Sequence, residues 1–228
     1  MYGIAEVERS VSVVNKYGFE VGLTACVLHI ASKPSASKRE LGWQKVREVW
    51  SGKSQADLSA DPVLSAYRQF LQGQIGASEN LLERFLFKGG IKSVNEVVDC
   101  LNLVCAQSRI TLAAFDARSV NGEMLLDLTT QDEKLKSIGG REVSIPSGEL
   151  VLRDEQRLIS WVGRRDGEAT KVEPDTAGVW LLGVRVKGVS EEMVTHALLD
   201  AVQELSDYFV IKRADVEEIG TEGVASLN

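Results

Sequence analysis

Residues 93–116 of this chain read SVNEVVDCLNLVCAQSRITLAAFD, and the pattern of apolar residues changes within this stretch. Its first part predicts a helix that opens with a capping box at residues 93–96 and runs to about Ala106. In a capping box, a serine oxygen and a glutamate carboxylate each accept a hydrogen bond from a backbone N–H that lacks a partner in the helix. The apolar segment from Ile110 to Phe115 then predicts a strand.

The residues before this stretch predict helices and one strand. Alternating apolar residues between Phe19 and Val27 predict a half-buried strand after a short N-terminal helix. Three further helices are expected: a helical region at about 38–50, a helix capped by Asp61 with Pro62 at its first position, and a helix capped by Ser78 and ended by Gly89 and Gly90.

The residues after it are rich in short apolar segments separated by turns. Strands are expected at 110–115, 124–128, 150–152, 158–162 and 179–186, with breaks at 121–122, 139–140, 146–148 and 165–167. Ser190 caps a last long helix, and Tyr208 to Ile211 form a closing strand. This order predicts an α/β fold, a mixed β-sheet flanked by helices, with an α+β arrangement as the alternative.

A length of 228 residues suits one domain. We expect residues 1–60 to supply helix and strand elements packed on a core at 60–213, and residues 214–228 to form an acidic tail. No run approaches the ~18 apolar residues of a membrane span, and the start lacks a signal peptide, so a cytoplasmic protein is expected. Cys26, Cys100 and Cys105 are expected to be buried free thiols rather than a disulfide or zinc site.

The net charge of -7 comes entirely from the residues after Val172, and the rest of the chain is neutral. A neutral body can still present a basic face to RNA, and the alternative is a solvated helix face. The candidate basic residues are Lys33, Lys38, Arg39, Lys45, Arg47 and Lys53, opposed by Glu40 and Glu48.

The sequence argues against a covalent hydrolase. It has only two histidines and lacks both a phosphate-binding glycine loop and a nucleophile elbow. We therefore expect no metal, cofactor or covalent nucleophile; an enzyme would position a water and a substrate. Residues 161–171, WVGRRDGEATK, place five charges and a threonine between two apolar strands. Such a loop binds a ligand if its polar groups converge, and the alternative is an ordinary exposed hairpin loop.

Several segments in order resemble the editing module of the phenylalanyl-tRNA synthetase β-subunit. These are residues 96–104, 111–116, 121–123, 133–135, 139–140, 149–154 and 161–184, and the resemblance covers about residues 60–210. The chain is most similar to the freestanding form of this module, the B-three/B-four domain proteins, at Tyr67-Arg68, Ser78-Glu79, Arg165-Asp166 and Thr170-Lys171.

The resemblance implies a pocket that accepts an aminoacyl ester on the terminal adenosine of tRNA and places water at its carbonyl carbon. The synthetase module removes tyrosine wrongly esterified to the tRNA for phenylalanine. Here the module's histidine falls on Ala113, and the glutamate that contacts the tyrosine hydroxyl falls on or beside Leu182. Because a site without that acceptor cannot read a hydroxyl, a smaller or apolar amino acid is expected.

The leading hypothesis is hydrolysis of misacylated tRNA in trans, with neither a membrane nor DNA as partner. The resemblance assigns catalytic roles to Asp116, Asp166 and Lys171, and substrate contacts to Glu79, Asn102, Ala113, Phe115, Arg165, Thr170 and Leu182. One alternative is a noncatalytic module that binds tRNA or an amino acid derivative, and another is a hydrolase of free amino acid derivatives. Asp116 and Asn102 could instead cap or bridge backbone beside a strand end.

Overall fold

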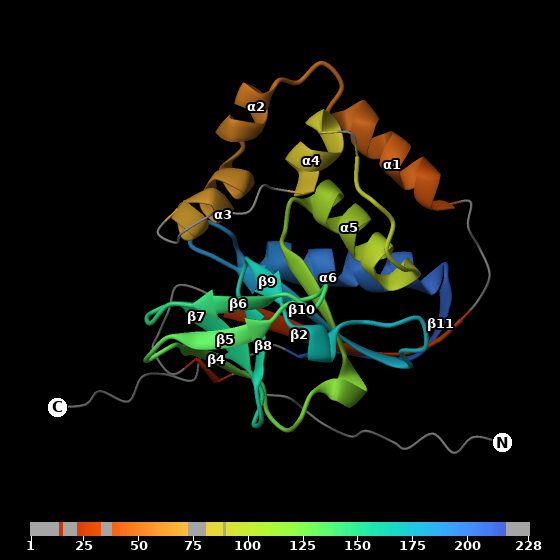
Figure 1. Ribbon diagram of the computed structural model, residues 1–228. Coiled ribbons are helices and arrows are strands. Elements are labelled where there is room, and N and C mark those ends of the chain that lie inside the picture. The colour runs from red at the N-terminus through yellow and green to blue at the C-terminus, as the bar shows by residue number, and fades with distance from the viewer. Residues whose placement is uncertain (1–13, 16–21, 33–37, 73–80, 89, 218–228) are drawn as a thin grey trace.

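Helices lie over one side of a group of β-sheets (Figure 1). The computed structural model describes residues 14–15, 22–32, 38–72, 81–88 and 90–217, and the expected caps and turns at Ser78 and Gly89 lie outside these residues. Within them, no helix is long and apolar enough to span a bilayer.

A four-stranded antiparallel sheet forms the centre of the fold. Its order is β11 (Phe209–Glu217), β2 (Gly22–Ser32), β10 (Gly178–Arg185) and β3 (Leu112–Asp116). β10 is buried from Gly178 to Val184, because strands pair on both of its edges and other elements cover both of its faces. Strand β2 comes from the first 60 residues and pairs with β11, which continues past residue 213. The division into residues 1–60, 60–213 and 214–228 stays a prediction.

Two further sheets lie beside it, one of five short strands and one of two. The five-stranded sheet has the order β1 (Val14–Asn15), β4 (Leu125–Leu128), β7 (Leu150–Arg153), β8 (Leu158–Trp161) and β9 (Arg165–Asp166), and only its β1–β4 pair is parallel. The hairpin of β5 (Glu133–Lys136) and β6 (Glu142–Ile145) forms the third sheet. Because the strands pair in antiparallel fashion except at β1–β4, the fold is the α+β alternative of the prediction.

The helices cover the four-stranded sheet and form a second, smaller core. They are α1 (Lys38–Val49), α2 (Gln55–Ala60), α3 (Pro62–Gln72), α4 (Leu81–Phe87), α5 (Glu96–Ser108) and α6 (Glu191–Ser206). The smaller core includes Val46, Leu58, Leu64 and Leu103, which pack between the first five helices. Short 3-10 turns occupy Ala117–Ser119 and Glu168–Thr170.

Helix α6 packs closely on β10 because residue 183 is glycine. A Cβ atom at Gly183 would lie 2.4 Å from the Val194 side chain, so any larger residue would push the helix away. Side chains alternate along a strand, and the neighbouring Leu182 therefore points to the opposite face of the sheet. That opposite face carries the candidate site.

Most elements expected within the described residues are confirmed, while α2 and β1 were not predicted. The capping box at residues 93–96 was wrong: Asn95 caps α5 by accepting from the Val98 N–H at 3.0 Å, and Ser93 instead donates to Asp99 at 2.5 Å. The capping oxygen must lie directly before the first helical turn, and Asn95 has that position. The hairpin of β5 and β6 was not predicted as two strands, because its charged residues hide the apolar period.

Asp61 caps α3 as expected and also joins it to Arg109. Its Oδ1 accepts from the N–H groups of Val63 and Leu64 at 3.0 Å, and its Oδ2 lies 2.8 Å from Arg109 Nη1. Burial would raise the pKa of Asp61, but the hydrogen bonds from Leu64 and Arg109 outweigh it, and the net shift is downward. The ionised carboxylate therefore stabilises the folded state.

We expect Asp61→Ala to lower the free energy of unfolding by about 1–2 kcal/mol near neutral pH, the usual cost of a lost cap. Since the folded pKa is lowered, this stabilisation is complete above the unfolded pKa of about 3.9 and is lost as pH falls through the folded pKa. Urea unfolding of both proteins across this range measures it. A difference that stayed constant into acid would show that the carboxylate's charge contributes nothing.

Candidate functional site

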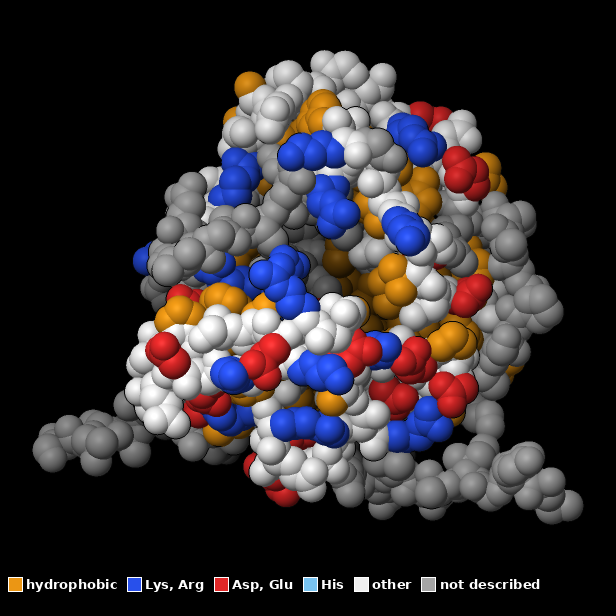
Figure 2. Space-filling model, viewed as in Figure 1, with side chains coloured by type: hydrophobic (Ala, Val, Ile, Leu, Met, Phe, Trp, Pro, Cys, Tyr) orange, Lys and Arg blue, Asp and Glu red, His pale blue; other side chains and the backbone are white. Residues whose placement is uncertain are grey.

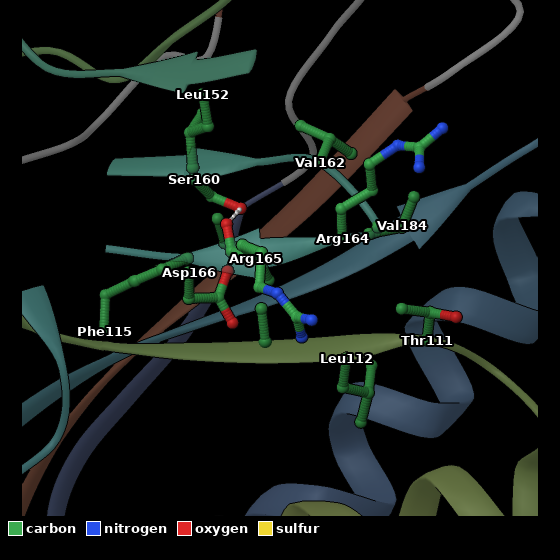
Figure 3. A pocket seen from close by; sticks show the side chains of 13 residues that line it. Thr111, Leu112, Phe115, Leu152, Ser160, Val162, Arg164, Arg165, Asp166 and Val184 are labelled. Atoms are coloured by element: carbon green, nitrogen blue, oxygen red, sulfur yellow. Dashed lines mark hydrogen bonds between the residues drawn. The ribbon is translucent and has the colours of Figure 1, made fainter. Parts of the chain in front are cut away.

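A cavity of about 210 Å³ lies between the four-stranded sheet and the hairpin of β8 and β9 (Figure 3). Its walls come from Thr111 and strand β3, from strand β10, and from residues 160–166 of the hairpin. The polar segment predicted to bind a ligand therefore does face the strand that ends in Asp116. These elements are distant in sequence and meet only in the folded chain.

The floor of the cavity is apolar. Ala113 and Leu182 are direct partners in the β3–β10 pairing, so their side chains lie on the same face of the sheet. Phe115 and Val184 also line the cavity from this sheet, and Leu152 lines it from β7. The two positions at which the chain departs from the synthetase pattern thus stand next to each other in the floor.

The polar edge of the cavity is formed by the hairpin. Ser160 of β8 pairs with Asp166 of β9, and Arg165 precedes Asp166 on the same strand. In Figure 3 the side chains of Arg165 and Asp166 both extend over the floor, and the Ser160 hydroxyl donates to the Arg165 carbonyl at 3.4 Å. A small set of convergent polar groups over an apolar floor is typical of a small-ligand site.

The hairpin turn comes at Gly163, whereas the sequence predicted a break at residues 165–167. Gly163 has a φ of 73°, and the Arg164 N–H donates to the Trp161 carbonyl at 2.9 Å to close the turn. A Cβ at Gly163 would lie 2.8 Å from the Leu71 side chain of α3. Glycine therefore permits both the backbone conformation and the contact with α3, and it leaves Arg165 and Asp166 free to pair as a strand.

A cluster of three side chains fixes the hairpin to the neighbouring strands. Trp161 Nε1 donates to Glu149 Oε2 at 2.9 Å, and the Arg164 guanidinium lies 4.9 Å from the centre of the Trp161 ring. Arg164 Nε is 3.9 Å from the same Glu149 oxygen, and its side chain is 4% exposed. Burial lowers the pKa of Arg164, and Glu149 opposes that shift. The cluster therefore holds the strand that carries Arg165 and Asp166.

Asp166 is a half-buried acid at the cavity. Burial raises the pKa of its carboxyl, and a hydrogen bond from Ser160 opposes this shift. A carboxyl with a raised pKa inside a cavity is the kind of group that functional sites use.

Asp116 lies outside the set of residues that line the cavity. It is buried and caps the turn Ala117–Ser119, accepting from the Arg118 N–H at 2.9 Å and from Thr176 Oγ1 at 2.8 Å. The Arg118 guanidinium pairs with it at 3.3 Å. The alternative interpretation of Asp116 as a backbone cap is thus confirmed, and its catalytic role stays a prediction.

Lys171, Thr170 and Asn102 also lie outside the cavity lining. Lys171 Nζ pairs with Glu168 at 2.5 Å and with Glu173 at 2.9 Å, and these hydrogen bonds raise its pKa. Thr170 is buried in the turn Glu168–Thr170, and Asn102 is half-buried on α5. Glu79 lies outside the described residues. Of the ten residues assigned from the resemblance, the cavity brings together Ala113, Phe115, Arg165, Asp166 and Leu182.

The sequence did not identify Ser160, Thr111 and Val184 as site residues, yet all three line the cavity. Ser160 carried a signal, since it is a polar residue beside Ile159 in an apolar strand. Thr111 and Val184 carried none, because their role depends on which elements pack opposite them. The described residues contain no group of three His, Cys, Asp or Glu side chains placed to hold a metal ion.

A family model described as the B3/4 domain matches residues 65–209, which include every residue of the cavity lining. The chain belongs to the B3/4 domain family. This confirms the resemblance found in the sequence, and it places the candidate site of this B3/4 domain protein within the matched region.

Curated relatives of this B3/4 domain protein are named phenylalanine–tRNA ligase beta subunit. Those of Photorhabdus laumondii and Vibrio cholerae are 31% identical over 105 residues and 33% identical over 100, which is 46% and 44% of this chain and 13% of each relative. That of Carboxydothermus hydrogenoformans is 29% identical over 150 residues, 64% of this chain and 18% of the relative. The matches thus span less than a fifth of these relatives.

A crystal structure of an N-terminal fragment of the phenylalanyl-tRNA synthetase beta-subunit from Pyrococcus horikoshii is also similar. It has a TM-score of 0.45 and 11% sequence identity, and the match covers 90% of this chain and 56% of that one.

The surface of the B3/4 domain protein is hollowed between the helices and the strands (Figure 2). Hydrophobic side chains lie in the depth of this hollow, Lys and Arg side chains gather over the helices above it, and both basic and acidic side chains lie along its lower rim. Among the described members of the basic face expected on the sequence, Arg47 pairs with Glu40 at 3.3 Å and lies over the Phe85 ring, while Lys53 lies over the Trp50 ring.

We expect Asp166→Asn to raise the free energy of unfolding at neutral pH, because it removes a charge from a site that disfavours it. A raised folded pKa means that the wild type loses stability as pH rises from the unfolded value of about 3.9 through the folded pKa. The advantage of the variant should therefore shrink as the pH falls toward that unfolded value. Chemical unfolding at several pH values tests this, with the exposed Asp200→Asn as the matched control. Equal destabilisation by both variants would contradict it.

Proposed function

We propose that this protein hydrolyses the ester bond of misacylated aminoacyl-tRNA in trans, with the side chain of the amino acid held in the cavity. The observation that supports it best is the pairing of Ala113 with Leu182 beneath Arg165 and Asp166, inside the region matched by the B3/4 family. The proposal places the reaction in the cytoplasm, with tRNA as the partner and with no membrane or DNA involved.

The size of the cavity favours an amino acid over a larger ligand. Pockets for drug-sized molecules occupy roughly 300–1,000 Å³, and this cavity of about 210 Å³ is smaller. A nucleotide would have to remain outside it. The cavity therefore suits a side chain, with the terminal adenosine outside it. Figure 2 shows Lys and Arg side chains over the helices above the hollow, where they could face the tRNA backbone.

The reaction requires a water and an oriented ester. The water oxygen attacks the carbonyl carbon, the bond from that carbon to the ribose oxygen breaks, and the ribose oxygen takes a proton. No histidine is among the described residues that line the cavity, so Ser160 lacks there the imidazole base of a Ser-His pair. Hydrolysis would therefore depend on the placement of substrate and water by the cavity edge.

The apolar floor predicts the class of amino acid. Leu182 offers no buried acceptor to a hydroxyl, and Ala113 leaves room above it. A site that does not pair with a hydroxyl discriminates only weakly for or against one. Because the floor supplies apolar contacts and no partner for a hydroxyl, we propose that the preferred side chain is apolar.

A panel of tRNAs, each charged with a different amino acid, tests the activity through the rate of ester loss. We expect the esters of apolar amino acids to react fastest. Asp166→Asn should lower kcat/KM by about 10- to 100-fold, the usual effect of losing a charged hydrogen-bond partner. Glu192→Gln on α6 is the matched control: Glu192 is exposed, and α6 lies on the sheet face opposite the cavity. No ester loss across the panel would reject the hydrolase.

Reducing the size of the cavity tests where the side chain lies. Ala113→Leu fills space above Leu182, so we expect kcat/KM to fall more for esters of large amino acids than for alanyl-tRNA. Ala113 is half-buried, which leaves room for the fold to tolerate the change. An equal loss for large and small amino acids would show that the side chain does not occupy this floor. Thermal unfolding of the variant checks that its fold is retained.

A noncatalytic binding module is the second candidate, and one observation favours it. Asp116 and Lys171, two of the three residues assigned to catalysis from the resemblance, are engaged with protein groups outside the cavity. Binding of uncharged tRNA that weakens steeply with salt, without ester loss, would support this candidate, because phosphate contacts release counterions.

A further inference from the structure

The Asp166 carboxyl stands at the edge of an apolar cavity. Its strand, β9, pairs with β8 on one side, and its backbone carbonyl accepts from the Ile138 N–H at 2.9 Å. Both contacts fix the backbone of Asp166 and leave its side chain directed over the floor, as Figure 3 shows. The carboxyl is thus held by a rigid strand pair and not by a loop.

Within the described part of the chain, no Lys or Arg forms an ion pair with Asp166. The nearby Arg164 is directed to Glu149 and the Trp161 ring. Arg165 is exposed, and its guanidinium forms no ion pair with its neighbour on the strand. The Ser160 side chain, on the paired strand, carries no charge, and its hydroxyl donates to the Arg165 carbonyl at 3.4 Å. Half-buried carboxylates are usually paired, because a charge removed from water without a counter-charge is costly.

A cationic group of a ligand would satisfy this carboxylate. In an aminoacyl ester, the α-carbon carries the side chain, the carbonyl carbon and an ammonium group. The ammonium group is one bond from the α-carbon. When the side chain lies on Ala113 and Leu182, the ammonium group therefore lies at the open edge of the cavity. Asp166 lines the same cavity as these two residues, so one ligand can reach both.

We propose that Asp166 binds the free α-ammonium group of the substrate, so that the site selects aminoacyl esters over N-acylated ones. This inference rests on the proposed function for its natural substrate. An N-acyl group removes the positive charge and adds bulk beside the carboxylate. Peptidyl-type esters are therefore excluded, and esters with a free amino group are accepted.

The first experiment compares a tRNA charged with the best amino acid of the panel and the same tRNA after N-acetylation. We expect N-acetylation to lower kcat/KM at least about 10-fold, which corresponds to about 1.4 kcal/mol. Asp166→Asn should slow the free-amine ester and leave the N-acetyl ester nearly unchanged. Glu192→Gln should change neither. Equal rates for the two esters on the wild type would overturn the ammonium contact while leaving the hydrolase intact.

The second experiment measures binding without any hydrolysis. NMR titration of the full chain with alaninamide, valinamide and leucinamide, and with their N-acetyl forms, reports on the cavity directly. We expect the free-amine amides to bind at least about 10-fold more tightly, with the preference lost in Asp166→Asn. This pattern together with no ester loss from any tRNA would reject the hydrolase and keep the ammonium site. Equal binding of both forms would reject the ammonium site.

Discussion

The pairing of β10 with β3 positions both the main core and the cavity. One face of β10 touches α6, because Gly183 has no side chain between the strand and Val194. The other face presents Leu182 beside Ala113 and becomes the cavity floor. A buried strand with both faces engaged cannot shift its register by one residue without exchanging these two faces. The same pairing thus sets the main core and the shape of the candidate site.

The second wall of the cavity depends on polar contacts of a different kind. The β8–β9 hairpin is short, and it is held by Trp161, Glu149 and Arg164 on one side and by the close approach of Gly163 to α3 on another. These contacts place Arg165 and Asp166 over an apolar floor. A site needs such supporting contacts, since small displacements of positioning groups reduce activity sharply.

Acidic residues in this chain serve opposite purposes, and their surroundings decide which. Asp61 and Asp116 accept hydrogen bonds from backbone N–H groups and arginine, so their carboxylates help to hold the fold. Asp166 lines the cavity without an ion-pair partner among the described residues, and burial disfavours its charged form. Retaining a destabilising charge at a cavity is typical of a residue kept for function rather than for stability.

Local elements and the family could be predicted from the amino-acid sequence. Caps such as Asp61 and Ser190 and the period of apolar residues predicted most helices and strands, because these signals depend on neighbours only a few residues away. Ordered motifs predicted the B3/4 family and identified Ala113, Leu182 and the polar hairpin. The convergence of particular polar residues became visible in the folded chain. Asp116 and Lys171 are bonded elsewhere, while Ser160 and Asp166 meet over the floor, because contacts between β3, β10 and β8–β9 join segments tens of residues apart that no local pattern records.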